Sequence, residues 1–144
     1  MSRALAVLAA TAVGVAAVAG AGPAAARTAK VGASTPCKLV TGAEAQAILK
    51  RHVQTTTALQ GPTCVYRIKN SKQQMTLSVQ KVSFSALKKV AKVVSSTTSG
   101  GHTLYCLKYG GSLTVVPLSG GRTLQVGGSC TPGFKFARTA LKRL

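Results

Sequence analysis

The stretch Pro36-Cys37-Lys38-Leu39-Val40-Thr41-Gly42-Ala43-Glu44-Ala45 opens the folded part of the chain. It contains the first of four cysteines, a helix start signal and the only acidic side chain among 144 residues. Thr41 and Glu44 have the spacing of a capping box, in which each side chain accepts a hydrogen bond from the other residue's backbone amide. We therefore expect Thr41 and Glu44 to cap a helix that runs to about His52, rather than to act in catalysis. The apolar stripe of this helix would consist of Ala43, Ala47 and Ile48.

The residues before this stretch have the composition of an export signal. Arg3 precedes an apolar run over residues 4–19, and Ala24-Ala25-Ala26 satisfies the small-residue cleavage rule. The run is shorter than the roughly 20 residues that a membrane-spanning helix needs. We expect residues 1–26 to be a cleaved signal peptide, residues 27–36 a flexible lead and residues 37–144 a single domain. The mature protein would be secreted, extracellular or cell-wall associated, and without a transmembrane segment.

The four cysteines indicate two disulfides. An even number of cysteines in a small exported chain is typical of a disulfide framework. No two of them are separated by two to four residues, as the paired ligands of a structural zinc site would be, so we expect neither a metal nor another cofactor. Three connectivities are possible. We favour Cys37–Cys64 and Cys106–Cys130, because each bridge closes a local loop.

Two further patterns follow the first helix. Residues 64–69 and 75–80 alternate apolar and polar side chains and have a turn between them, which predicts a β-hairpin. Ser85 can cap a second helix, whose apolar side chains recur at helical spacing and which the polar run 95–99 would end. These apolar side chains are Leu87, Val90, Ala91 and Val94.

Glycine pairs divide the C-terminal part of the chain. They separate the segments 102–109, 112–118 and 122–126, and such pairs favour the positive-φ turns that join antiparallel strands. We expect a three-stranded meander, in which Pro117 marks a sheet edge or a strand end. Thr131-Pro132 then predicts a last helix, with threonine as the N-cap and proline at the first position. Its buried stripe would consist of Phe134, Ala137, Ala140, Leu141 and Leu144.

These elements together predict the fold class. We expect an α+β domain with a five-stranded antiparallel sheet and helices packed against it. The expected order of elements is α-β-β-α-β-β-β-α, with two disulfides.

The cysteine-containing motifs resemble those of a known group. Pro36-Cys37-Lys38-Leu39-Val40-Thr41 with Glu44-Ala45, followed by Cys64-Val65-Tyr66, is similar to actinobacterial exported and lipoprotein domains of unknown function. Those domains open on a Cys-x-Leu-Leu-Thr…Glu-Ala helix and continue with a Cys-x-Trp strand. The likeness covers roughly residues 36–144; it departs at Tyr66, where tryptophan is usual, and in lacking a lipid-attachment cysteine. The resemblance implies an envelope location, a non-catalytic role and a Cys37–Cys64 bridge.

The charge of the chain is strongly one-sided. There are 19 lysines and arginines against one acid, and cleavage after Ala26 would lower the formal charge from +18 to +17, because Arg3 is lost. Such a charge attracts polyanions. The partner would be an anionic cell-wall polymer or a phospholipid surface; signatures of specific nucleic-acid binding modules are missing. A surface that serves only solubility is the alternative. Candidate polyanion contacts are Lys88, Lys89, Lys92, Lys142 and Arg143.

The residue types limit catalysis. The chain has no aspartate and one glutamate, which excludes hydrolysis by paired carboxylates. Our leading hypothesis is therefore a secreted, non-catalytic, basic protein that binds at the envelope. The second is a protein-binding factor such as a protease inhibitor, with residues 54–62 as its exposed loop. The third is a small basic ribonuclease that uses His52 and His102 as acid and base.

Overall fold

A computed structural model describes residues 36–58 and 61–144. The expected signal peptide and residues 27–35 of the expected lead lie outside the described residues. The helices are α1 (Pro36–Leu39), α2 (Gly42–Leu49), α3 (Phe84–Val90) and α4 (Cys130–Leu141). The strands are β1 (Val53–Thr57), β2 (Thr63–Ile68), β3 (Gln74–Gln80), β4 (Lys92–Ser99), β5 (His102–Tyr109), β6 (Gly111–Leu118) and β7 (Arg122–Gly127), with a short 3-10 turn at Ser119–Gly121.

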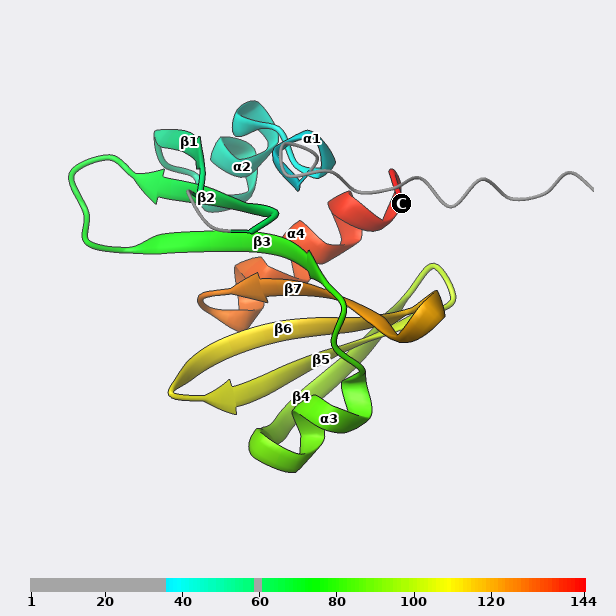
Figure 1. Ribbon diagram of the computed structural model, residues 1–144. Coiled ribbons are helices and arrows are strands. Elements are labelled where there is room, and N and C mark those ends of the chain that lie inside the picture. The colour runs from blue at the N-terminus through cyan, green and yellow to red at the C-terminus, as the bar shows by residue number, and fades with distance from the viewer. Residues whose placement is uncertain (1–35, 59–60) are drawn as a thin grey trace, which may run out of the picture.

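The seven strands form one antiparallel sheet in the order β1-β2-β3-β7-β6-β5-β4. The strands β1, β2 and β3 are neighbours in chain order. The chain then passes through α3 to β4 at the opposite edge of the sheet. From there β4, β5, β6 and β7 follow one another back as a meander, and β7 pairs with β3. The edges are therefore β1 and β4. In Figure 1, α1 and α2 lie at the β1 end of the sheet, and α3 lies at the β4 end.

The main core lies between the sheet and α1, α2 and α4. Side chains on alternate positions of a strand face the same side, and those facing these helices are fully buried in the central strands. The T-shaped contact between Tyr66 and Phe136, with ring centroids 5.0 Å apart, joins β2 to α4. On the opposite face, Phe84 of α3 stacks on Tyr105 of β5 at 4.1 Å. The fully buried large side chains of the main core include Val40, Tyr66, Leu77, Leu104, Val116, Leu124, Val126 and Phe136.

The expected five-stranded sheet is wrong, because two strands were not predicted. The first is β1, which pairs along its whole length with β2. Its side chains are exposed except at Val53, so it lacks the alternation of a half-buried strand. The preceding helix ends at Leu49 rather than at His52, because Lys50 turns into the left-handed region at φ 56°. Of its residues Ala45 is buried, whereas Ala43 and Ala47 of the expected stripe are exposed.

The second unpredicted strand is β4, which replaces the end of the expected second helix. The helix starts earlier, at Phe84 with Ser83 as its N-cap, and ends at Val90. Residues 92–99 are rich in β-branched valine and threonine, which favour strands, and they pair with β5. Val90 and Val94, expected in an apolar stripe, are exposed. The helical spacing of these residues was therefore coincidental, and pairing with β5 determined the structure.

The remaining elements follow the predicted pattern more closely. The hairpin β2–β3 and the strands β5, β6 and β7 lie where the alternation and the glycine pairs place them. Strand β6 is interior to the sheet, but its pairing with β5 stops at Val115, so Pro117 lies opposite Thr123 of β7 and has no partner on the β5 side, next to the strand end. The last helix begins at Cys130, with Ser129 rather than Thr131 at the N-cap. Phe136, missing from the expected stripe, is fully buried, whereas Leu144 is exposed.

Candidate functional site

The two disulfides are Cys37–Cys64 and Cys106–Cys130, which confirms the favoured connectivity. The first bridge ties α1 to β2, with Cα atoms 5.0 Å apart, and Cys37 Sγ lies 3.8 Å from Oγ1 of Thr57 at the end of β1. The second bridge ties β5 to the start of α4. All four cysteines are therefore structural, and they hold α1 and α4 on one face of the sheet.

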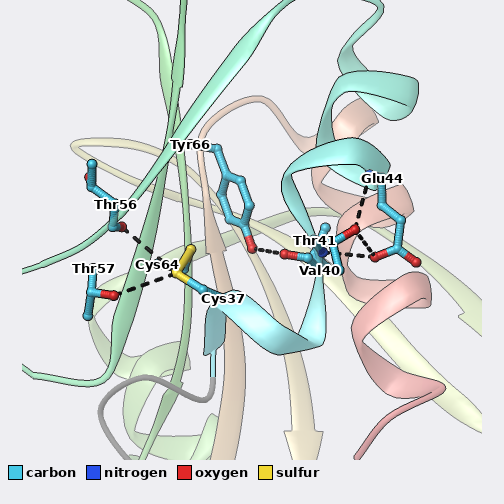
Figure 2. Close-up of a disulfide and its surroundings, with 8 residues drawn as sticks. All are labelled: Cys37, Val40, Thr41, Glu44, Thr56, Thr57, Cys64 and Tyr66. Atoms are coloured by element: carbon cyan, nitrogen blue, oxygen red, sulfur yellow. Dashed lines mark hydrogen bonds between the residues drawn. A yellow bond between two sulfur atoms is a disulfide. The ribbon is translucent and has the colours of Figure 1, made fainter.

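Tyr66 reinforces the first bridge from the inside. Its hydroxyl group donates a 2.6 Å hydrogen bond to the carbonyl oxygen of Val40, which fixes the segment between α1 and α2 (Figure 2). Burial raises the pKa of Tyr66, so the hydroxyl stays a proton donor. The tyrosine thus has a structural role.

Thr41 and Glu44 form the capping box of α2, as Figure 2 shows. The Thr41 amide donates to Oε2 of Glu44 at 2.8 Å, and the Glu44 amide donates to Oγ1 of Thr41 at 3.3 Å. Arg143 donates from Nη2 to Oε1 of Glu44 at 2.7 Å, from Nη1 to Oε2 at 2.9 Å, and from Nη1 to the carbonyl oxygen of Leu39 at 2.7 Å. The hydrogen bonds from Arg143 and from the Thr41 amide lower the pKa of Glu44 to about 2. This carboxylate is fully engaged in holding the fold.

The pairing of Glu44 affects every other basic residue. Because Glu44 is the only Asp or Glu in the sequence, no other lysine or arginine can pair with an acidic side chain of the same chain. Among residues 36–58 and 61–144, Arg143–Glu44 is the one ion pair. The remaining cationic side chains in these ranges have no acidic side chain as a partner and are balanced by ions from solution.

Polar and basic side chains gather around a hollow at the β1 edge. We call it the cationic corner; its residues are Lys50, Arg51, His52, Lys69 and Asn70. They line a surface hollow of about 390 Å³. An adjoining hollow of about 250 Å³ shares the first three residues and extends to Gln46.

Backbone geometry assembles the cationic corner. The left-handed turn at Lys50 ends α2 and redirects the chain into β1. The Lys69 amide donates a 2.9 Å hydrogen bond to the His52 carbonyl oxygen, and Val53 is paired with Ile68 directly beside it. Residues 50–52 are thereby held against the β2–β3 turn, where Asn70 adopts φ 58°. Two segments separated in sequence thus present their side chains around one space.

The electrostatics of the corner favour an anion. Cations at a helix C-terminus interact favourably with the helix dipole, which offsets part of the repulsion between Lys50 and Arg51. Lys69 adds a third cation to the same hollow. Arginine and lysine together can bind a phosphate group through charge-assisted hydrogen bonds. The lining is polar throughout, which suits a hydrated anionic group rather than an apolar ligand.

The structure divides the five expected polyanion contacts between two places. Lys88 and Lys89 are in the last turn of α3, and Lys92 is the first residue of β4. Lys142 and Arg143 follow α4, where Arg143 is bound to Glu44. Figure 1 shows α3 and the C-terminal end of the chain well separated. The five residues are therefore not one site.

The positions of the two histidines and of residues 54–62 bear on the ribonuclease and protease-inhibitor hypotheses. His52 precedes β1 and His102 begins β5, and four strands lie between these two. Five strand spacings of about 4.8 Å put them roughly 24 Å apart, too far to act on one phosphate. Of the segment 54–62 expected as an inhibitory loop, residues 54–57 are in β1, and residues 59–60 lie outside the described residues.

Sequence reasoning did not bring together Lys50, Arg51, His52 and Lys69. The available signal was the Lys-Arg-His triplet followed directly by the β-branched run of β1, whose pairing with β2 would have placed Lys69 beside it.

Within the described ranges, no group of three or more His, Cys, Asp or Glu side chains is arranged to hold a metal. No helix there has both the length and the hydrophobicity to cross a bilayer. Comparison with protein-family models, curated proteins and solved structures finds no match.

Proposed function

We propose that this chain is an exported, non-catalytic binding domain that attaches to a phosphate-bearing polymer of the cell envelope through the cationic corner. One observation carries the proposal: three cations and a histidine surround one hollow, in a chain whose only carboxylic side chain is bound by Arg143. Export rests on the signal-like residues 1–26, and the two disulfides agree with an oxidising compartment. The resemblance to exported actinobacterial domains points the same way.

Phosphate chemistry suits this corner better than a carboxylate polymer does. A phosphate group offers several acceptor oxygens, so Lys50, Arg51 and Lys69 can contact one group or two neighbouring groups along a chain. Each neutralised phosphate also releases condensed counter-ions, which favours binding at low salt and makes the affinity salt-dependent. A wall polymer with a repeating phosphodiester backbone presents many such groups.

The test compares two triple variants with the same loss of charge. Lys50→Gln/Arg51→Gln/Lys69→Gln removes the cations of the corner. Glutamine is chosen because Lys50 has a positive φ, and neither lysine nor glutamine is branched at Cβ, so the substitution adds no backbone strain there. The matched control is Lys38→Gln/Lys81→Gln/Lys135→Gln, which removes three exposed lysines elsewhere. Affinity for poly(glycerol phosphate) is measured by calorimetry, with hyaluronate as a carboxylate polymer for comparison.

We expect the wild type to prefer the phosphate polymer. The corner variant should lose at least about tenfold in affinity, the effect of roughly 1.4 kcal/mol, and the control variant at most about threefold. An equal loss in both variants would show that charge acts diffusely, without a site. Absence of wild-type binding at low salt would refute the proposed function itself.

A further inference from the structure

A second surface, at the opposite edge of the sheet, combines exposed apolar side chains with lysines. We call it the α3–β4 tip. Its apolar members are Val90, Val93, Val94 and Tyr109, which are 62%, 39%, 53% and 62% exposed. Among the described residues, the other exposed large hydrophobic side chains are Val82 and Leu144. Most of the exposed apolar groups therefore gather in one place, which on a soluble surface marks an interaction site.

Strand pairing holds the members of the tip together. Val90 ends α3, and β4 starts two residues later. Lys92 lies opposite Lys108, so the residues just before Lys92 and just after Lys108, including Tyr109, lie at the same end of the two strands. A β-bulge between Val93 and Ser95 makes Val94 an extra residue in the edge strand. Figure 1 shows α3, the start of β4 and the end of β5 together at one end of the molecule.

Four lysines lie at the same end of the sheet as these apolar side chains. Lys88 and Lys89 belong to the last turn of α3, and Lys92 and Lys108 form a directly opposed pair of like charges. Such a pair destabilises a sheet unless a counter-charge neutralises it. Glu44 cannot do so, because Arg143 holds it near α2. A negatively charged partner that also accepts apolar groups would relieve this repulsion.

We infer that the α3–β4 tip docks on the surface of a membrane that contains anionic phospholipid. Val90, Val94 and Tyr109 enter the interfacial region of the bilayer, and the four lysines contact the phosphate groups around them. Tyrosine suits this zone because its ring is apolar and its hydroxyl stays hydrated. Lysines near an anionic membrane each strengthen binding about fivefold. This surface is distinct from the cationic corner, since six strand spacings of about 4.8 Å, roughly 29 Å, separate the two sheet edges.

A second copy of the chain is a less suitable occupant of this edge. Antiparallel addition of β4 to β4 of another copy would bring Lys92 near the far end of the other strand, and that copy offers no unpaired acidic side chain to the lysines of the tip, because its Glu44 is bound by Arg143. Lysines and bulges on an edge strand are devices that prevent such pairing. A lipid surface instead supplies the negative charge that the tip lacks.

The first test uses vesicles and a matched pair of double variants. Val90→Ser/Val94→Ser removes apolar groups from the tip, and Val82→Ser/Leu144→Ser removes the same number from the other exposed apolar positions. Binding is measured by co-sedimentation with phosphatidylcholine vesicles, either pure or with about a third phosphatidylglycerol. We expect the wild type to bind the anionic vesicles and not the neutral ones. The tip variant should bind at least about fivefold more weakly, and the control variant should bind as the wild type does.

The second test reports where the protein touches the lipid. The chain contains no tryptophan, so Tyr109→Trp and Leu144→Trp each introduce a single fluorophore, at the tip and at the C-terminus. With anionic vesicles the fluorescence of the Tyr109→Trp variant should shift to shorter wavelength, and that of Leu144→Trp should not. The inference is overturned if wild-type protein ignores anionic vesicles, if both double variants lose binding equally, or if the protein binds while the tip fluorophore stays hydrated. Binding through the cationic corner alone would leave the Tyr109→Trp fluorophore hydrated and would be equal in both double variants, so the proposed function and this inference can fail separately.

Discussion

Nη2 of Arg143 lies 2.7 Å from Oε1 of Glu44, although 99 residues separate them in the chain. The same guanidinium group donates to the Leu39 carbonyl oxygen, between α1 and α2. The end of the last helix is therefore fastened to the start of the second. The only acidic side chain serves the fold, and the other basic residues are left for external anions.

Glu44→Gln tests what the ion pair adds to the capping box. Glutamine can still close the box, but it loses the charge that Arg143 binds. We expect the midpoint of thermal unfolding to fall by about 2–5 °C, because a partly exposed bidentate pair is worth little more than a typical surface pair. Arg143→Gln should give a drop at least as large, because it also loses the hydrogen bond to the Leu39 carbonyl oxygen, and the double variant should be no worse than Arg143→Gln. Fully additive losses would mean that the two side chains are not coupled.

The lowered pKa of the Glu44 carboxylate should make the stability of the protein depend on pH. This pKa is about 2 in the folded protein and 4.5 in the unfolded chain. A lowered folded pKa stabilises the protein above the unfolded value, and this contribution disappears as the pH falls from 4.5 towards 2. We expect the difference in unfolding midpoint between wild type and Glu44→Gln to be constant near neutral pH and to shrink below about pH 4. A difference that persists unchanged at pH 2 would contradict the assignment.

Gly133 of α4 lies close to Thr114 of β6, and the packing of the helix on the sheet requires a residue without a side chain there. A Cβ atom at this position would overlap Oγ1 of Thr114 on β6, a buried hydroxyl that has no hydrogen-bond partner among the described residues. Gly133→Ala should therefore destabilise the protein by about 2 kcal/mol, as overpacking does. Adding Thr114→Ala removes the overlapping oxygen and should recover most of this loss. If denaturant unfolding shows the double variant to be less stable than Gly133→Ala, the contact does not limit the packing.

Each disulfide should contribute measurably to stability. The bridges close loops with sequence separations of 27 and 24 residues, for which the chain-entropy model gives about 3–4 kcal/mol each. Cys106→Ala/Cys130→Ala removes the bridge that fixes the start of α4. We expect denaturant unfolding to show a loss of that size. A loss below about 1 kcal/mol would show that the core alone holds α4 in place.

Local signals in the sequence predicted much of this fold. The Thr41–Glu44 spacing, the four cysteines and the glycine pairs each depend on neighbouring residues or on loop closure, and each corresponds to a feature of the structure. The two edge strands were missed because an edge strand buries little. Only Val53 of β1 is partly buried, and in β4 the valines are exposed, so neither strand has a clear period of two.

The candidate site was missed for the same reason. Lys50, Arg51 and His52 are brought beside Lys69 by the pairing of β1 with β2. Without β1, the triplet looks like the charged end of a helix and Lys69 like an ordinary turn residue. Likewise, the segment that contains Lys88, Lys89 and Lys92 was expected to be a single helix. The structure instead has a strand from Lys92, and the pairing of Lys92 with Lys108 places these two lysines at the same end of the sheet as the exposed apolar side chains.

The most direct test of the central claim is an amide NMR titration of the wild-type protein with tripolyphosphate. A phosphate site at the cationic corner predicts saturable shifts at residues 50–52 and 69–70, with one dissociation constant, and the loss of these shifts in Lys50→Gln/Arg51→Gln/Lys69→Gln. Small shifts spread over all basic surfaces, without saturation and unchanged in that variant, would contradict a binding site at this corner.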